Sequence, residues 1–117
     1  MAEPIERDAW LREPVAARLD RLSTDFAAIA SCITQRQPDA ALSAMLTETE
    51  TRCRWAADTS TEPVRSLLTN LTQPLQTWRQ VWSRLGTQPE FRQAVAREAE
   101  MWSRRLQALR REQSAGA

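Results

Sequence analysis

Few residues in this chain of 117 could carry chemistry, because it contains no histidine and only two cysteines. Histidine is the side chain that most often acts as a general acid or base near neutral pH. Cys32 lies nearly in phase with the apolar residues Ile29 and Ile33, which predicts a buried and unreactive thiol. Glu98 lies near an apolar face, where we expect it to pair with an arginine across the bundle. We therefore expect no catalytic site.

A resident metal or cofactor is not expected either. The Glu-x-x-His motif of di-iron bundles requires a histidine, and two glycines cannot form the phosphate-binding loop of a nucleotide site. In a hairpin that turns near residue 37, Cys53 lies about three helical turns from the point opposite Cys32, so no disulfide is predicted.

Two tryptophans are out of phase with the apolar faces around them. Around the helix axis, Trp55 projects away from Cys53 and Ala56, in a direction between those of Arg52 and Arg54. Trp10 is also out of phase. An exposed tryptophan flanked by arginine is typical of a protein interface. The predicted interface residues are Trp10, Arg52, Arg54 and Trp55. The alternative is that Trp10 folds back and covers Trp55 or another internal surface of the same subunit.

Arginines recur along the C-terminal segment. Arg97, Arg104 and Arg111 are spaced seven residues apart, on the helical face opposite Trp102. Such a row can bind phosphates or anionic lipid. The candidate polyanion-binding residues are Arg97, Arg104, Arg105, Arg110 and Arg111. The other interpretation is a solvated face partly neutralised by Glu100, and the lack of lysine and of interleaved exposed aromatics favours it.

Charge is unevenly distributed along the chain. All sixteen basic residues are arginine, which indicates a GC-rich genome, and the net charge is +1. The segment from Leu75 to Leu106 has the character of a small bacterial protein, so a bacterial source is expected. Residues 1–62 hold seven arginines and eleven acids, whereas residues 63–117 hold nine arginines and four acids. The two halves can attract one another within a bundle or between subunits, and the near-neutral total makes nucleic acid an improbable partner.

The N-terminus is acidic and shows no signal peptide, and no apolar run is long enough to span a membrane, so a cytoplasmic location is expected.

Apolar residues recur at alternating spacings of four and three, which predicts an all-α fold. The first set is Val15, Leu19, Leu22, Phe26, Ile29 and Ile33. The second is Val64, Leu68, Leu71, Leu75, Trp78, Trp82 and Leu85. The third is Phe91, Val95, Trp102, Leu106 and Leu109. We expect one domain over 1–117, an antiparallel up-down four-helix bundle with a short N-terminal helix.

Prolines, a glycine and turn residues set the expected boundaries. The predicted segments are a lead-in over 1–12, helices over 13–36, 39–57, 62–85 and 88–112, and a frayed tail over 113–117. The third long helix is expected to continue through Pro74 with a kink, because the apolar spacing keeps its phase there. Thr87 and Glu90 match a capping box for the last helix.

The short link at Gly86 predicts an antiparallel hairpin between the last two helices. In such a hairpin Trp82 contacts Phe91, and Leu71 contacts Trp102.

These patterns favour a non-catalytic protein–protein interaction or assembly module, with a homodimer as the expected form. One alternative is a binder of nucleic acid or an anionic surface that uses the arginine-rich last helix. The other is a small-molecule carrier or enzyme with a pocket near Pro74, where a kink could open space beside Trp78.

Overall fold

The computed structural model describes the backbone of residues 2–115 and the side chains of residues 7–113. All five regular elements of this range are α-helices. They are α1 (Ala2–Arg12), α2 (Val15–Thr34), α3 (Asp39–Thr59), α4 (Val64–Leu85) and α5 (Pro89–Ala115).

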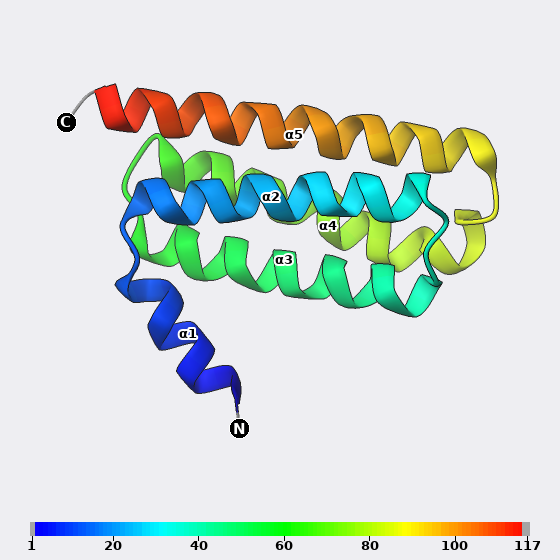
Figure 1. Ribbon diagram of the computed structural model, residues 1–117, viewed down its shortest axis with the longest axis horizontal. Coiled ribbons are helices and arrows are strands. Elements are labelled where there is room, and N and C mark those ends of the chain that lie inside the picture. Colours follow the sequence, from blue (N-terminus) through cyan, green and yellow to red (C-terminus); the bar gives the residue numbers. More distant parts are fainter. Residues whose placement is uncertain (1, 116–117) are drawn as a thin grey trace.

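Helices α2 to α5 run alternately up and down and form an antiparallel bundle, while α1 leaves the bundle at an angle (Figure 1). The most extensive packing is between α2 and α5, followed by α3 with α4 and α2 with α3. Helix α1 touches α3, and α4 contacts α5 far less than α2 does. The predicted four-helix bundle with a short N-terminal helix is confirmed.

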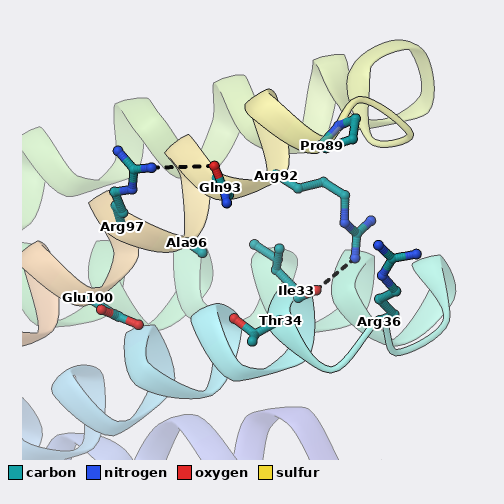
Figure 2. A pocket seen from close by; sticks show the side chains of 9 residues that line it. All are labelled: Ile33, Thr34, Arg36, Pro89, Arg92, Gln93, Ala96, Arg97 and Glu100. Carbon is teal, nitrogen blue, oxygen red and sulfur yellow. Dashed lines mark hydrogen bonds between the residues drawn. The ribbon is translucent and has the colours of Figure 1, made fainter.

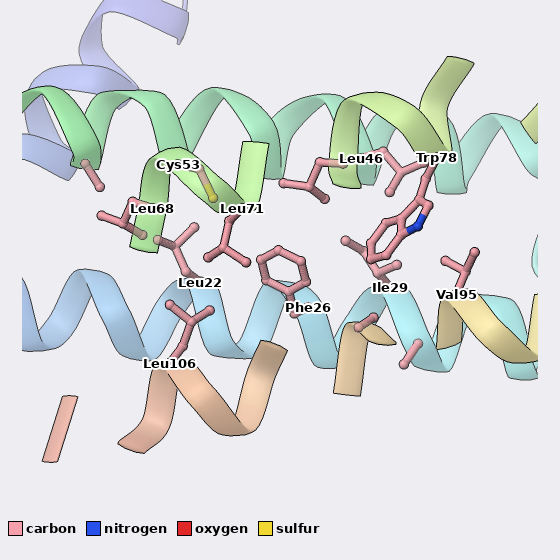
Figure 3. Packing of buried hydrophobic residues seen from close by; sticks show 14 of the residues in the cluster. Leu22, Phe26, Ile29, Leu46, Cys53, Leu68, Leu71, Trp78, Val95 and Leu106 are labelled. Carbon is pink, nitrogen blue, oxygen red and sulfur yellow. The ribbon is translucent and has the colours of Figure 1, made fainter. Parts of the chain in front are cut away.

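The predicted apolar faces form the core. Phe26 of α2, Leu71 of α4 and Leu106 of α5 are each fully buried and lie near the centre of the bundle (Figure 3). Trp78 and Trp82 are buried as expected, whereas Trp102 is half-buried and packs against the edge of the core. The four-and-three spacing therefore identifies most of the buried positions.

Small residues bring α2 and α5 close together. Ala30 and Ala99 are buried, and Ser23 of α2 lies opposite Ser103 of α5. Each hydroxyl lies within hydrogen-bond distance of the other residue's carbonyl, at 3.0 and 2.9 Å, and the two hydroxyl oxygens are 2.9 Å apart. Because these side chains are short and satisfy each other, α5 packs chiefly on α2.

The predicted hairpin between α4 and α5 is present at its turn, where the rings of Trp82 and Phe91 lie 5.5 Å apart. Farther along, α4 and α5 contact each other little and Trp102 is half-buried. The expected contact between Leu71 and Trp102 stays a prediction. At the turn, a Cβ on Gly86 would come within 2.6 Å of the Trp82 carbonyl oxygen and 2.7 Å of the indole nitrogen. A glycine is needed at position 86 because Trp82 packs against it and leaves no room for a side chain.

The predicted capping box of α5 is wrong by one residue. The Gln88 carbonyl accepts the first amide hydrogen bond of the helix, from Arg92, so Gln88 is the N-cap and Pro89 the first helical residue. Thr87 lies one residue outside the position that a capping box requires.

Two other boundary predictions have different outcomes. Helix α4 continues through Pro74, as expected. Helix α5 extends to Ala115, so the prediction of a frayed tail is wrong for residues 113–115. Residues 116–117 lie outside the described range.

Candidate functional site

The described part of the chain contains no reactive centre built from its cysteines. Cys32 and Cys53 are both free and buried. Burial raises the pKa of each thiol, most strongly for Cys53, where nearby carboxylates of Asp25 and Glu50 act in the same direction. Within the described residues, no three acidic or cysteine side chains gather closely enough to bind a metal ion.

The predicted exposure of Trp10 is wrong. Its side chain is 3% exposed, because the end of α1 nearest the bundle contacts α3 and the indole joins the bundle core. The Arg21 guanidinium lies 5.8 Å from the centre of the indole ring and forms an ion pair with Glu13 at 3.1 Å. Trp10 therefore attaches α1 to the bundle, which is the alternative that the sequence left open.

The other three predicted interface residues lie on α3, with partners inside the chain. Trp55 is half-buried and packs against the core. Arg52 forms an ion pair with Asp25 of α2 at 3.3 Å, and Arg54 pairs with Glu50. The two arginines predicted at the interface thus form ion pairs within the chain. An interface role for Trp55 stays a prediction.

Sequence reasoning did not identify two carboxylates on this side of the bundle, of which Glu50 is buried and Asp25 is half-buried. Glu50 is 4% exposed and lies between Arg54 of its own helix and Arg79 of α4, the latter at 3.1 Å. Burial raises the pKa of Asp25, and the Arg52 guanidinium partly opposes that rise. Both acids therefore connect neighbouring helices. The signal available in the sequence was that Glu50 interrupts the apolar residues of α3, between Leu46 and Cys53.

The arginines predicted to bind polyanions on α5 fall into two groups. Arg110 forms an ion pair with Asp20 of α2 at 3.1 Å, and the Arg105 guanidinium lies 5.1 Å from the ring centre of Trp102. Arg97, Arg104 and Arg111 are exposed.

These three exposed arginines have no acidic partner among the described side chains. Arg97 makes a 3.4 Å hydrogen bond to the Gln93 amide oxygen and no ion pair. The neutralisation of Arg97 and Arg104 by Glu100, which the sequence left open, is absent from the described ion pairs. We call Arg97, Met101, Arg104 and Arg111 the outer face of α5.

Arg92 organises the end of the bundle where α5 begins. Its guanidinium donates to the Gly86 carbonyl at the end of α4 and to the Ile33 carbonyl at the end of α2, both at 2.9 Å. It also lies 5.3 Å from the ring centre of Trp82, whose indole N–H donates to the Asp39 carboxylate at 3.2 Å. One side chain thus joins the ends of three helices.

Cavities lined by described residues include the following three, and Pro74 does not line any of these three. One, of about 390 Å³, lies between the end of α2 and the start of α5, and a second, of about 470 Å³, lies beside it at the same end of the bundle. The third, of about 350 Å³, lies between the start of α4 and the end of α5.

No family model, curated protein or solved structure matches this chain significantly. Within the described range, each helix is either too short or too polar to cross a lipid bilayer.

Proposed function

We propose that this protein is a non-catalytic protein-binding module, and that the outer face of α5 binds an acidic segment of a partner protein. The observation that carries the proposal is the contrast between arginines. Arg97, Arg104 and Arg111 remain exposed without an acidic partner in the described structure. By contrast, Arg52 and Arg54 form ion pairs with acids of the same chain.

The composition of this face favours a protein over a nucleic acid or a membrane. Met101 lies among the arginines and is 37% exposed, which makes it the one exposed large hydrophobic side chain of the described surface. Methionine adapts its shape to apolar groups of a protein partner. Glu100 interrupts the positive charge. Among the side chains of residues 7–113, no fully exposed aromatic ring offers a stacking platform for bases.

The same surface favours a monomer that binds a partner over a permanent homodimer. Permanent homodimers bury an apolar patch of several hundred square ångströms in each subunit. Apart from Met101, the described side chains expose no large hydrophobic residue. An acidic segment would be attracted by the unpaired guanidinium groups and held by a small apolar contact.

The absence of histidine from the chain and the burial of both cysteines support a non-catalytic role. Two acids on the α2–α3 side of the bundle, Glu50 and Asp25, are engaged in ion pairs between helices.

The test compares two double charge reversals with the same change in net charge. Arg104→Glu with Arg111→Glu alters the outer face of α5, and Arg65→Glu with Arg84→Glu alters two exposed arginines of α4. Each tagged protein is used to capture partners from its own cells. Every captured candidate is then purified and titrated into each variant by calorimetry at low and physiological salt.

We expect a partner that binds the unaltered protein and the α4 variant and loses at least about tenfold in affinity with the α5 variant. Equal affinity for both variants would overturn the proposal. Binding of duplex DNA or anionic vesicles that depends on Arg104 and Arg111 would replace the protein partner with a polyanion. Concentration-dependent dimers in light scattering, lost only in the α5 variant, would replace it with a second copy of this chain.

A further inference from the structure

The cavity of about 390 Å³ at the start of α5 has the size of a small-ligand pocket. Its floor is apolar and consists of Ile33 of α2 and Ala96 of α5 (Figure 2). Around this floor stand three arginines, Arg36, Arg92 and Arg97, and one acid, Glu100. The lining therefore carries an excess of two positive charges.

Arg92 is the fixed donor of this pocket. Two of the five N–H groups of its guanidinium donate to the carbonyls of Gly86 and Ile33. The stacking of the guanidinium on Trp82 holds its plane. Its remaining N–H groups are thus presented by a side chain that is already ordered, and little conformational entropy is lost when they bind a ligand.

Arg36 is held at the pocket by an unusual backbone conformation. It has a φ of 55°, in the left-handed region, at the C-terminal end of α2. The Gln37 amide bonds to the Cys32 carbonyl and the Arg36 amide to the Ile33 carbonyl, the pattern of a Schellman motif. Glycine usually occupies this position because a side chain adds strain there.

In this conformation Arg36 lines both cavities at this end of the bundle. Figure 2 shows the guanidinium groups of Arg36 and Arg92 at one end of the first pocket and the side chains of Arg97 and Glu100 at the other. No acidic partner of Arg36 or Arg97 is present among the described ion pairs. Guanidinium groups gathered around an apolar floor match a small anion with an apolar body.

We propose that this pocket binds a small organic anion, with a phosphate or carboxylate group held by Arg36 and Arg92 and an apolar body on Ile33 and Ala96. The excess of two positive charges suits a ligand of charge −1 or −2, and Glu100 opposes a longer polyanion. The pocket stands independently of the protein-binding function, although Arg97 belongs to both surfaces.

Calorimetry with phenyl phosphate, benzoate and inorganic phosphate tests the proposal. We expect phenyl phosphate to bind the unaltered protein with a dissociation constant below about 1 mM, and inorganic phosphate to bind at least about tenfold more weakly because it lacks the apolar body. Benzoate binding as tightly as phenyl phosphate would identify the anion as a carboxylate. No binding of phenyl phosphate or benzoate at 10-fold higher concentration, on the order of 10 mM, would overturn the proposal.

Variants separate a pocket from general attraction to a charged surface. Arg36→Gln is expected to weaken phenyl phosphate binding about tenfold, whereas Arg84→Gln on α4, which does not line the pocket, leaves it unchanged. Equal loss in both variants would contradict the proposal.

Arg36→Gly guards against a loss caused by misfolding. It removes the guanidinium and relieves the left-handed backbone, so the melting temperature should rise by about 3–6 °C while binding weakens. A stabilised variant that retains full binding would contradict the role of Arg36. Arg104→Glu with Arg111→Glu should leave phenyl phosphate binding intact, so the pocket and the protein-binding face can fail separately.

Discussion

Two groups of arginines in this molecule differ in whether they bond to other groups of the chain. Arg52, Arg54, Arg79 and Arg92 bond to acids or helix-end carbonyls of their own chain, whereas Arg104 and Arg111 project from α5 without such partners. Within the first group, Arg52, Arg79 and Arg92 join different helices, so their removal should cost stability, whereas Arg54 pairs with Glu50 inside α3. The second forms none of the described ion pairs between helices, and we propose that it binds another molecule. Residue type alone does not separate arginines that join helices from arginines that stay exposed, whereas their contacts do.

The largest loss of stability is expected at Arg92. Arg92→Met removes two charged hydrogen bonds and the stacking on Trp82, and leaves the Ile33 and Gly86 carbonyls without this donor. We expect the free energy of unfolding to fall by about 2–3 kcal/mol, measured by urea denaturation. Arg84→Met at the exposed end of α4 is the control, and an equal loss there would remove the distinction between the two groups.

A smaller loss is expected beside Arg92, at Gly86. Gly86→Ala places a methyl group against the Trp82 carbonyl and indole, so the ring or the backbone must shift, which disturbs the contacts of Trp82 with Arg92 and Phe91. Overpacking of this kind costs about 1–3 kcal/mol. Urea denaturation and the Trp82 indole N–H signal in NMR measure the effect. An unchanged indole signal would show that this end of the bundle is less constrained than its contacts indicate.

The burial of Asp25 beside Arg52 predicts that the stability of the fold depends on pH. Burial raises the pKa of Asp25 above its ordinary value of 3.8, so the folded state holds this proton more tightly than the unfolded chain. The contribution of Asp25 to stability should therefore fall as pH rises above 3.8 and level off above the pKa of Asp25 in the folded state.

Melting temperatures of the unaltered protein and of Asp25→Asn, compared from pH 3 upward, isolate this contribution, since other carboxyl groups such as Glu62 are common to both. Hydrogen bonds from Ser66 lower the pKa of Glu62, and its own contribution is lost as pH falls. A difference in melting temperature that stays constant across the acidic range would contradict the raised pKa of Asp25.

The smallest effect on stability is expected on the outer face of α5. Arg104→Glu with Arg111→Glu should change the free energy of unfolding by no more than about 0.5 kcal/mol, because neither guanidinium has a partner among the described side chains. Thermal denaturation followed by circular dichroism measures it. A loss comparable to that of Arg92→Met would mean that these arginines hold the fold together and are not available for a partner.

Most of the fold could be predicted from sequence, because apolar spacing reports which face of each helix is buried. Leu19, Phe26, Leu71 and Leu106 show this directly. The pattern failed where small or charged residues take apolar positions. Ser23 and Ser103 bring α2 and α5 together through reciprocal hydrogen bonds, and Glu50 is buried because two arginines neutralise it. Neither effect can be read from one helix alone.

The candidate sites were less predictable for a related reason. Trp10 is out of phase with the apolar face of the following helix. The chain changes direction between α1 and α2, at Pro14, and the Trp10 ring is buried, so helical phase did not predict its exposure. The spacing of Arg97, Arg104 and Arg111 did identify an exposed face of α5, because a long helix keeps its phase. The pocket at Arg36 and Arg92 joins the ends of separate helices and had no signature along the chain.

The most direct test of the central claim is NMR mapping of the contact surface with a purified partner. Arginine Nε–H and backbone amide signals of isotope-labelled protein are followed as the partner is added, together with the indole signal of Trp55. The account predicts that the largest changes fall on Arg97, Arg104 and Arg111, with Trp55 unmoved. Changes centred on Trp55 and α3, with the outer face of α5 unaffected, would contradict it.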